Sequence, residues 1–453
     1  MSVERSAAPV AAGRVEPRLP RIDRFELSNG ARVASTSYSG TPETLIQLQI
    51  PAGRSREPLE QLGLASLVAK AMNEGTRALS TVEWIDAIDL LGANLHVFSD
   101  DDALTLSLRV LDKHLEKALE LFADVLFEPR FDVADFERVR KLRLAALATR
   151  ADDAATVAQD AWQRLMYGAA TSLGWPAVGT AESVARLGVN DLREFHRAAL
   201  DPRASSIAVV SRWNESELLR LLSPLAARWP ASSPSPCEAT PFAAQPAAPG
   251  LYCVDRPGAA QTELHVGFLS VSARDPDWLA LSALNYPFGG QFTSRINLEL
   301  REKRGFTYGA RSAFEAALRP APFAIHAAVH TQHTAEAIRV CLAQLSAYLD
   351  GPTEAEIAFT RDALEQSLAR QFESPAARMS YLQHVERFGW PGDYPLVRLA
   401  QLATLGRAGL RALARRHLAP PGWVILAVGP RSALAGLDEL GPVHALDAKG
   451  APV

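Results

Sequence analysis

The pattern of apolar and polar residues predicts the same series of elements twice along the chain. Alternating apolar and polar residues predict strands, and apolar residues at every third or fourth position predict helices. In the first half these elements are strands over 25–37 (with a turn at Asn29-Gly30) and 44–50, helices over 63–72 and 81–91, a hairpin of 94–99 and 103–110, and helices over 114–126 and 133–151. In the second half they are strands over 251–254 and 261–269, helices over 277–288 and 293–303, strands over 307–314 and 323–330, and helices over 334–349 and 354–372.

The ends of the two halves also correspond. Residues 191–196 lead to an apolar strand over 207–210, and residues 410–417 lead to a strand over 424–428. The predicted fold class is therefore α+β, with two homologous domains that each consist of an antiparallel sheet with helices packed on one face. Repeated units of about 220 residues are domains, because solenoid repeats have periods of about 20–50. Two such halves can enclose a cavity between them.

Composition places the boundaries between these domains. Serine, proline and alanine dominate residues 231–250, which predicts an interdomain linker. Residues 1–20 are rich in alanine and proline and are expected to form a disordered lead. The N-terminal domain then covers 21–230 and the C-terminal domain covers 251–453.

Charge and composition exclude several classes of function. The 453 residues include 47 basic and 51 acidic side chains, a net charge of −4, which gives no basic excess for nucleic acid or an anionic membrane. No apolar run approaches the roughly 20 residues of a membrane span. The three cysteines (Cys237, Cys253 and Cys341) form neither a disulfide framework nor a metal-type spacing. Localisation stays open between the cytoplasm and, if an export signal was removed, the periplasm.

One short segment carries residues suited to chemistry. Arg301 and Tyr308 lie seven residues apart, on either side of Gly305. If a helix ends near Lys303 and a strand begins near Phe306, both side chains point into one space. There they can donate hydrogen bonds to a carbonyl oxygen that becomes negative during acyl transfer. The plain alternative is a basic helix C-terminus capped by glycine.

Several segments in this order resemble a known family. They are residues 63–65 (Gly-Leu-Ala), 73–76 (Asn-Glu-Gly-Thr), 179–184, 191–196 and 300–308. With the repeated organisation, the chain from about Phe25 to Gly441 resembles the pitrilysin/insulinase class of inverted-motif zinc peptidases. The resemblance is greatest to the processing-peptidase branch, in which two homologous subunits pair as a clamshell.

The zinc ligands of that family are missing here. Active members carry His-x-x-Glu-His on the helix after Gly-Leu-Ala, and a glutamate about 76 residues later completes the site. The corresponding positions are Ser66, Ala69 and Lys70, followed by Ala146. Zinc needs deprotonated donors, and a lysine ammonium repels it. We therefore expect this chain to bind no metal. The close histidines His326, His330 and His333 are expected to be structural or surface residues.

The resemblance implies a role for the residues that are retained. Arg301 and Tyr308 match the arginine and tyrosine with which the family orients substrate and stabilises the oxyanion, and Gly289-Gly290 would let an extended backbone approach. The main hypothesis is a heterodimer in which a homologous subunit with an intact His-x-x-Glu-His motif holds zinc and this chain holds no cofactor. The chain alone would be inactive, and the pair would cleave peptides internally.

Two other functions remain open. Core subunits of a respiratory complex keep this fold as a scaffold, and a chamber that binds peptides without cleaving them is the third possibility. The acidic run Asp100-Asp101-Asp102 is expected to form a solvated hairpin turn.

Overall fold

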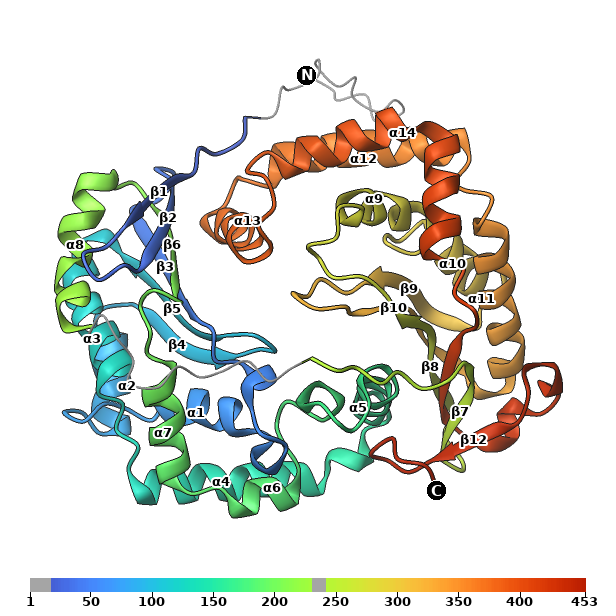
Figure 1. Ribbon diagram of the computed structural model, residues 1–453, viewed down its shortest axis with the longest axis horizontal. Helices are drawn as coiled ribbons and strands as arrows, with labels where there is room; N and C mark the ends of the chain where they lie inside the picture. The colour runs from blue at the N-terminus through green and yellow to red at the C-terminus, as the bar shows by residue number, and fades with distance from the viewer. Residues whose placement is uncertain (1–17, 230–241) are drawn as a thin grey trace, which may run out of the picture.

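The computed structural model describes residues 18–229 and 242–453, which form two six-stranded sheets with helices around them (Figure 1). The first sheet has the order β1-β2-β6-β3-β5-β4 and the second has the order β12-β7-β11-β8-β10-β9. The strands are β1 (Asp23–Glu26), β2 (Arg32–Ser37), β3 (Glu43–Ile50), β4 (Asn94–Ser99), β5 (Leu104–Leu111), β6 (Ser206–Ser211), β7 (Gly250–Asp255), β8 (Gln261–Leu269), β9 (Thr307–Phe314), β10 (Pro322–His330), β11 (Val424–Gly429) and β12 (Val443–Leu446).

The sheets are mixed, whereas the sequence predicted antiparallel ones. β6 runs parallel to β2, and β11 and β12 run parallel to β7, while the other strand pairs are antiparallel. The reason is the connection, because β6 and β11 return to their sheets after helical segments rather than through a tight hairpin. The α+β class and the two similar halves agree with the prediction.

Helices of each half cover one face of that half's sheet and bury a separate core. Their apolar positions recur at helical spacing, as at Ala118, Phe122 and Val125, all of which are buried. In the first half the helices are α1 (Leu64–Met72), α2 (Thr81–Leu90), α3 (Leu115–Phe127), α4 (Val133–Ala148), α6 (Ala181–Arg186), α7 (Val189–Ala199) and α8 (Glu215–Arg228). In the second half they are α9 (Trp278–Phe288), α10 (Arg295–Asn297), α11 (Thr334–Tyr348), α12 (Glu354–Arg370) and α14 (Tyr394–His417).

Two further helices are exchanged between the halves. Helix α5 (Ala154–Tyr167) belongs to the first half by sequence, but its buried side chains, among them Trp162, pack on the second sheet against Leu426 and Val428. Helix α13 (Pro375–Phe388) belongs to the second half and packs on the first sheet, where Met379 and Leu382 join Leu45, Ala208 and Val210. Figure 1 shows α13 beside the first sheet and α5 beside the second. Each sheet is thus covered on its second face by a helix of the other half.

The described end of the predicted linker is packed rather than free. The backbone N–H of Gln245 donates to the carbonyl of Tyr167, and that of Ala247 donates to the carbonyl of Leu165, at 3.0 and 2.7 Å. Residues 1–17 and 230–241, which hold most of the predicted lead and linker, lie outside the described residues. In the described part of the chain, no helix has both the length and the apolar character that a membrane crossing requires.

Candidate functional site

Arg301 and Tyr308 lie next to each other at the start of β9. Arg301 belongs to a π-helical turn (Leu298–Lys303), a rare geometry that is frequent at functional sites. Gly305 takes a positive φ of 66° and turns the chain into β9. The guanidinium carbon of Arg301 lies 5.2 Å from the centre of the Tyr308 ring and 4.5 Å from that of Phe292. The Tyr308 side chain is 88% exposed, so its hydroxyl is available to a ligand.

The predicted backbone approach at Gly289-Gly290 has a structural explanation. Gly289 ends α9 and accepts a hydrogen bond from the backbone of Ser312 on β9 at 2.9 Å. A Cβ at Gly289 would lie 2.1 Å from the Ser312 hydroxyl, and one at Gly290 would lie 2.9 Å from the Tyr286 backbone. Close packing of α9 against β9 therefore accounts for the absence of a side chain at Gly289, and the last turn of α9 itself leaves no room for one at Gly290.

We expect Gly289→Ala to destabilise the fold more than Gly290→Ala. The methyl group at 289 would overlap both the side chain and the backbone of Ser312, which costs about 1–3 kcal/mol or more. Urea unfolding of the two variants measures the difference. If Gly289→Ala is as stable as the unmodified protein but binds peptide more weakly, the packing explanation is wrong and Gly289 serves the approach of substrate.

The positions of the missing zinc motif lie on two adjacent helices. On α1, Ala69 is buried at 3% exposure, and Lys70 is half exposed with its ammonium 4.0 Å from Glu74. Ser66 donates to the Gly63 carbonyl at 2.9 Å. Ala146, at the position of the third ligand on α4, is exposed.

A guanidinium lies where α1 and α4 meet. Arg143 of α4 donates to the hydroxyl of Ser66 at 2.8 Å and to the carbonyl of Val178 at 3.0 Å. Burial lowers the pKa of Arg143, but arginine stays charged in proteins. With Lys70 one turn along α1, this place presents two cations and a hydroxyl, and the carboxylate of Glu74 beside Lys70 is already paired with Lys70 and Arg138. These residues do not fit zinc, which requires carboxylate, imidazole or thiolate donors.

Glu57 lies buried beneath the N-terminus of α1. Its carboxylate accepts hydrogen bonds from the backbone of Gly63 at 2.9 Å and Ala65 at 2.6 Å, so it satisfies N–H groups that the helix leaves free. Burial raises the pKa of Glu57 to about 7, and the opposing hydrogen bonds and the charges of Arg54 and Arg143 are weaker effects.

This raised pKa predicts a pH dependence of stability. The folded state holds the Glu57 proton more tightly than the unfolded chain does, so the stability that this proton contributes is present below the ordinary glutamate pKa of 4.5 and is lost as the pH rises through about 7. We expect the free energy of unfolding to fall by up to about 3 kcal/mol over that interval, relative to Glu57→Gln. Urea unfolding at several pH values measures this. The exposed Glu60→Gln is the control, and identical pH profiles for Glu57→Gln and the unmodified protein would contradict the assignment.

The only metal-type cluster in residues 18–229 and 242–453 is already satisfied by protein groups. It consists of Asp275, Asp277 and His417. Both Nε2 of His417, at 2.8 Å, and a guanidinium nitrogen of Arg416, at 2.5 Å, contact the same carboxylate oxygen of Asp277. This arrangement is an ion-pair network at the C-terminus of α14.

The histidines that the sequence singled out do not converge. His326 is partly buried and packs edge-on against His265, with ring centres 4.4 Å apart, and burial lowers its pKa to about 4. His333 stacks on Phe306 at 4.2 Å, and His330 is exposed at the end of β10. Their contacts are those of structural and surface side chains.

Side-chain amides occupy hydrogen-bonding positions at the free edges of both sheets, which the sequence did not predict. Asn73, at the end of α1, donates to the Val97 carbonyl at 2.8 Å and accepts from the Val97 N–H at 2.9 Å on β4. Asn297 of α10 accepts from Ala310 on β9 at 2.9 Å. An amide in these places takes up bonds that an added peptide strand would otherwise make.

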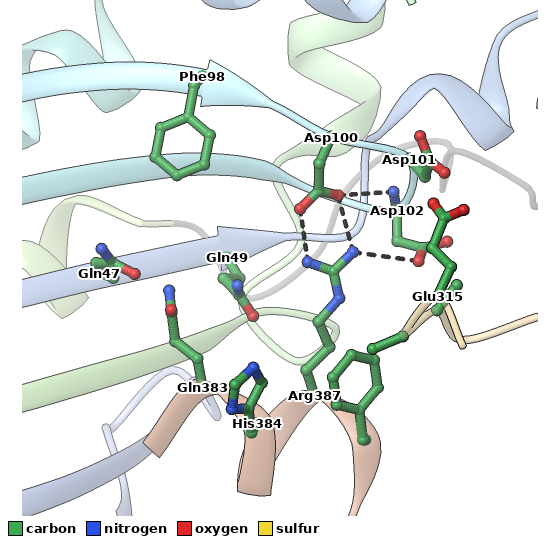
Figure 2. A pocket seen from close by; sticks show the side chains of 13 residues that line it. Gln47, Gln49, Phe98, Asp100, Asp101, Asp102, Glu315, Gln383, His384 and Arg387 are labelled. Atoms are coloured by element: carbon green, nitrogen blue, oxygen red, sulfur yellow. Dashed lines mark hydrogen bonds and ion pairs between the residues drawn. The ribbon is translucent and has the colours of Figure 1, made fainter. Parts of the chain in front are cut away.

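The prediction for Asp100-Asp101-Asp102 is correct about the hairpin turn but wrong about solvation, because Asp102 is buried and the side chains of Asp100 and Asp101 are only 34% and 29% exposed. They form the tip of the β4–β5 hairpin and line a cavity of about 450 Å³ between the two halves (Figure 2). Asp100 and Asp102 bond Arg387 of α13, and Asp101 bonds Arg54. The sequence signal was misleading because the arginine partners are distant along the chain.

The comparisons with known proteins agree with this architecture. The family model described as "Insulinase (Peptidase family M16)" matches residues 32–172, and the one described as "Peptidase M16 inactive domain" matches residues 186–364. Together they match more than half of the chain. The chain belongs to the insulinase (M16) family of peptidases. The predicted resemblance is thereby confirmed.

Individual insulinase-family relatives differ in how they are described. An "uncharacterized zinc protease" of Mycobacterium leprae is 26% identical over 384 residues, which cover 83% of this chain and 85% of that protein. A "non-peptidase homolog" of Helicobacter pylori is 29% identical over 153 residues, covering 34% and 35% of the two chains. The crystal structure of a "peptidase M16 inactive domain" from Pseudomonas fluorescens is 26% identical, with a TM-score of 0.82, and covers 90% of this chain and 98% of that one. With the unsuitable donors at the motif, these findings support a catalytically inactive insulinase-family subunit.

Proposed function

We propose that this chain is the non-zinc subunit of a heterodimeric zinc metallopeptidase that cleaves peptides internally. A homologous partner with an intact His-x-x-Glu-His motif holds the zinc, and this chain supplies Arg301 and Tyr308 to the partner's site. The observation that carries the proposal is the contrast between the two halves. The partly buried Arg301 contacts the exposed Tyr308 at β9, while Ser66, Lys70 and Arg143 stand where a metal site would be.

The chemistry of the pair fits substrate orientation and oxyanion stabilisation. The Tyr308 hydroxyl is a neutral donor, and the Arg301 guanidinium offers several N–H groups from a side chain that already contacts two rings. Donors held in place before the reaction stabilise a developing negative charge without reorganising. Zinc in the partner subunit would supply Lewis-acid chemistry that this chain cannot.

We further propose that backbone pairing with the peptide occurs mainly on the partner, and the capped sheet edges support this. Asn73 takes both outward groups of Val97, and on β9 the groups of Ser312 are bonded to Gly289 and Asn285. Tyr308 at the beginning of β9 lies before this occupied stretch. The peptide is then held on this chain through side chains.

Mixing the subunits tests the proposal. The chain alone, titrated with zinc, should neither bind stoichiometric metal nor cleave a quenched fluorescent peptide library, and addition of a zinc-bearing homologue from the same organism should produce cleavage. Elemental analysis and peptidase assays measure both results. Full activity from the zinc-bearing subunit alone, or stoichiometric zinc in this chain, would overturn the proposal.

A structural subunit is the second candidate. Helix α2 exposes Val82, Ile85 and Leu90 at 68, 50 and 84%, an apolar set that a protein interface could cover. Under this function the chain copurifies in a stable complex whose other members keep full activity when Arg301 and Tyr308 are both replaced. Loss of peptidase activity in those variants distinguishes the first candidate from the second.

A further inference from the structure

Arginines from two segments of the second half meet one acidic hairpin tip of the first half. Asp102 is only 8% exposed and bonds Arg319 of the β9–β10 hairpin as well as Arg387 of α13, the latter at 3.2 Å. Arg387 also holds Asp100 through two bonds of 2.5 and 2.9 Å. Arg319 donates in addition to the Ser55 hydroxyl at 3.1 Å. Figure 2 shows the Arg387 guanidinium between the two carboxylates.

The first half shapes this tip without help from the second. The Asp100 side chain accepts from the backbone of Asp102 and Ala103 at 2.8 and 2.9 Å. The N–H groups of Arg54 and Ser55 donate to the carbonyls of residues 100 and 101 at 3.1 and 2.9 Å. The carboxylates are therefore already in place when the arginines of the other half reach them, which lowers the entropy cost of pairing.

Because the carboxylates at this hairpin tip are partly or fully buried, they depend on their arginine partners. Buried ion pairs give less net stability than their Coulomb attraction suggests, but a carboxylate left there alone is strongly unfavourable. Next to the pairs lies the cavity of about 450 Å³, whose wall includes Gln49, Gln383 and His384. The apolar contacts that the two halves share lie at α5 and, on α13 itself, at Met379 and Leu382. Another ion pair between the halves, Arg24 with Glu386, is largely exposed and therefore weaker.

We infer that Asp100 and Asp102, with Arg319 and Arg387, form a clasp that fixes the separation of the two sheets and so the width of the space between them. The clasp sets geometry more than stability. When its charges are removed, the β4–β5 and β9–β10 hairpins separate, the cavity opens, and the halves sample several separations about the exchanged helices. The inference does not depend on the proposed peptidase function.

Distance measurements between the halves test the clasp. Spin labels at Leu90→Cys on α2 and Ala347→Cys on α11 report the separation by double electron–electron resonance in a Cys237→Ser background, since Cys253 and Cys341 are buried. We expect one narrow distance in the otherwise unmodified chain. The double variant Arg319→Gln/Arg387→Gln should give a longer mean distance and a broader distribution.

A matched control and a single variant complete the experiment. Arg339→Gln breaks an ion pair with Glu439 that lies wholly within the second half, and it should leave the distance narrow. If the double variant does not fold, Arg319→Gln alone gives the test, because it removes one partner of Asp102 while Arg387 stays in place, and it should also broaden the distribution. A narrow, unshifted distance in the double variant or in Arg319→Gln overturns the inference.

Discussion

Arg301→Ala is expected to lower kcat of the assembled peptidase by about 10²–10³-fold, with a smaller change in KM. A donor aimed at the developing oxyanion is worth most in the transition state, and removal of one such donor typically costs about 3–4 kcal/mol. Steady-state kinetics of the reconstituted heterodimer measure the effect. Because the guanidinium contacts both Phe292 and Tyr308, the alanine variant also frees the tyrosine ring, so the loss should exceed that of Tyr308→Phe.

Neighbouring arginines provide the controls for this prediction. Arg304 lies three residues away, but its guanidinium is bonded to Glu299, so Arg304→Ala should leave kcat within a few fold. Arg301→Lys keeps the charge and loses the planar fork, and it should recover only part of the rate. If Arg301→Ala and Arg304→Ala reduce kcat equally, the effect is general charge and not a positioned donor.

Trp162→Ala should cost about 3–5 kcal/mol of unfolding free energy, the usual range for removing a large buried aromatic side chain. Trp162 is 5% exposed on α5, where it packs among the side chains of the second sheet and against the His265 ring at 5.5 Å. Removing Trp162 leaves a void on the face of the second sheet that the helices of the second half do not cover. Urea unfolding followed by circular dichroism measures the loss.

A tryptophan within one half gives the comparison. Trp213 is only partly buried against the core of the first half, so Trp213→Ala should cost less. We also expect Trp162→Ala to broaden the unfolding transition, because α5 couples the halves. A loss below about 1 kcal/mol for Trp162→Ala would mean that α5 adds little to the second sheet.

Most of the elements could be predicted from the sequence because local pattern determines them. The predicted strand at 44–50 corresponds to β3 (Glu43–Ile50), and the helix at 354–372 corresponds to α12 (Glu354–Arg370). Helix α12 begins at a capping box of Thr353 and Glu356, a signal contained within four residues. The exchange of α5 and α13 could not be predicted, because the apolar pattern of a helix does not indicate on which sheet the helix packs.

The same difference between local and distant signals decides which residues of the candidate site could be predicted. Arg301 and Tyr308 were brought together by a helix end, a glycine and a strand, all of them local features. By contrast, Asp102 and Arg319 are 217 residues apart, and charge alone could not pair them. Asn73 was also missed, because its function depends on an edge strand that lies 24 residues further along the chain. Side chains whose partners lie in other elements carry little signal in a single sequence.

The exchanged helices also bear on how such a chain could originate. One helix of each half packs on the sheet of the other half. An isolated half would therefore expose an apolar sheet face to water and would leave an apolar helix with no sheet to pack on. Two copies of one ancestral half would satisfy both needs by embracing each other about a two-fold axis, and reciprocal exchange is an inexpensive route to a dimer. Gene duplication and fusion would then keep this arrangement within a single polypeptide, and the two originally identical halves would be free to diverge.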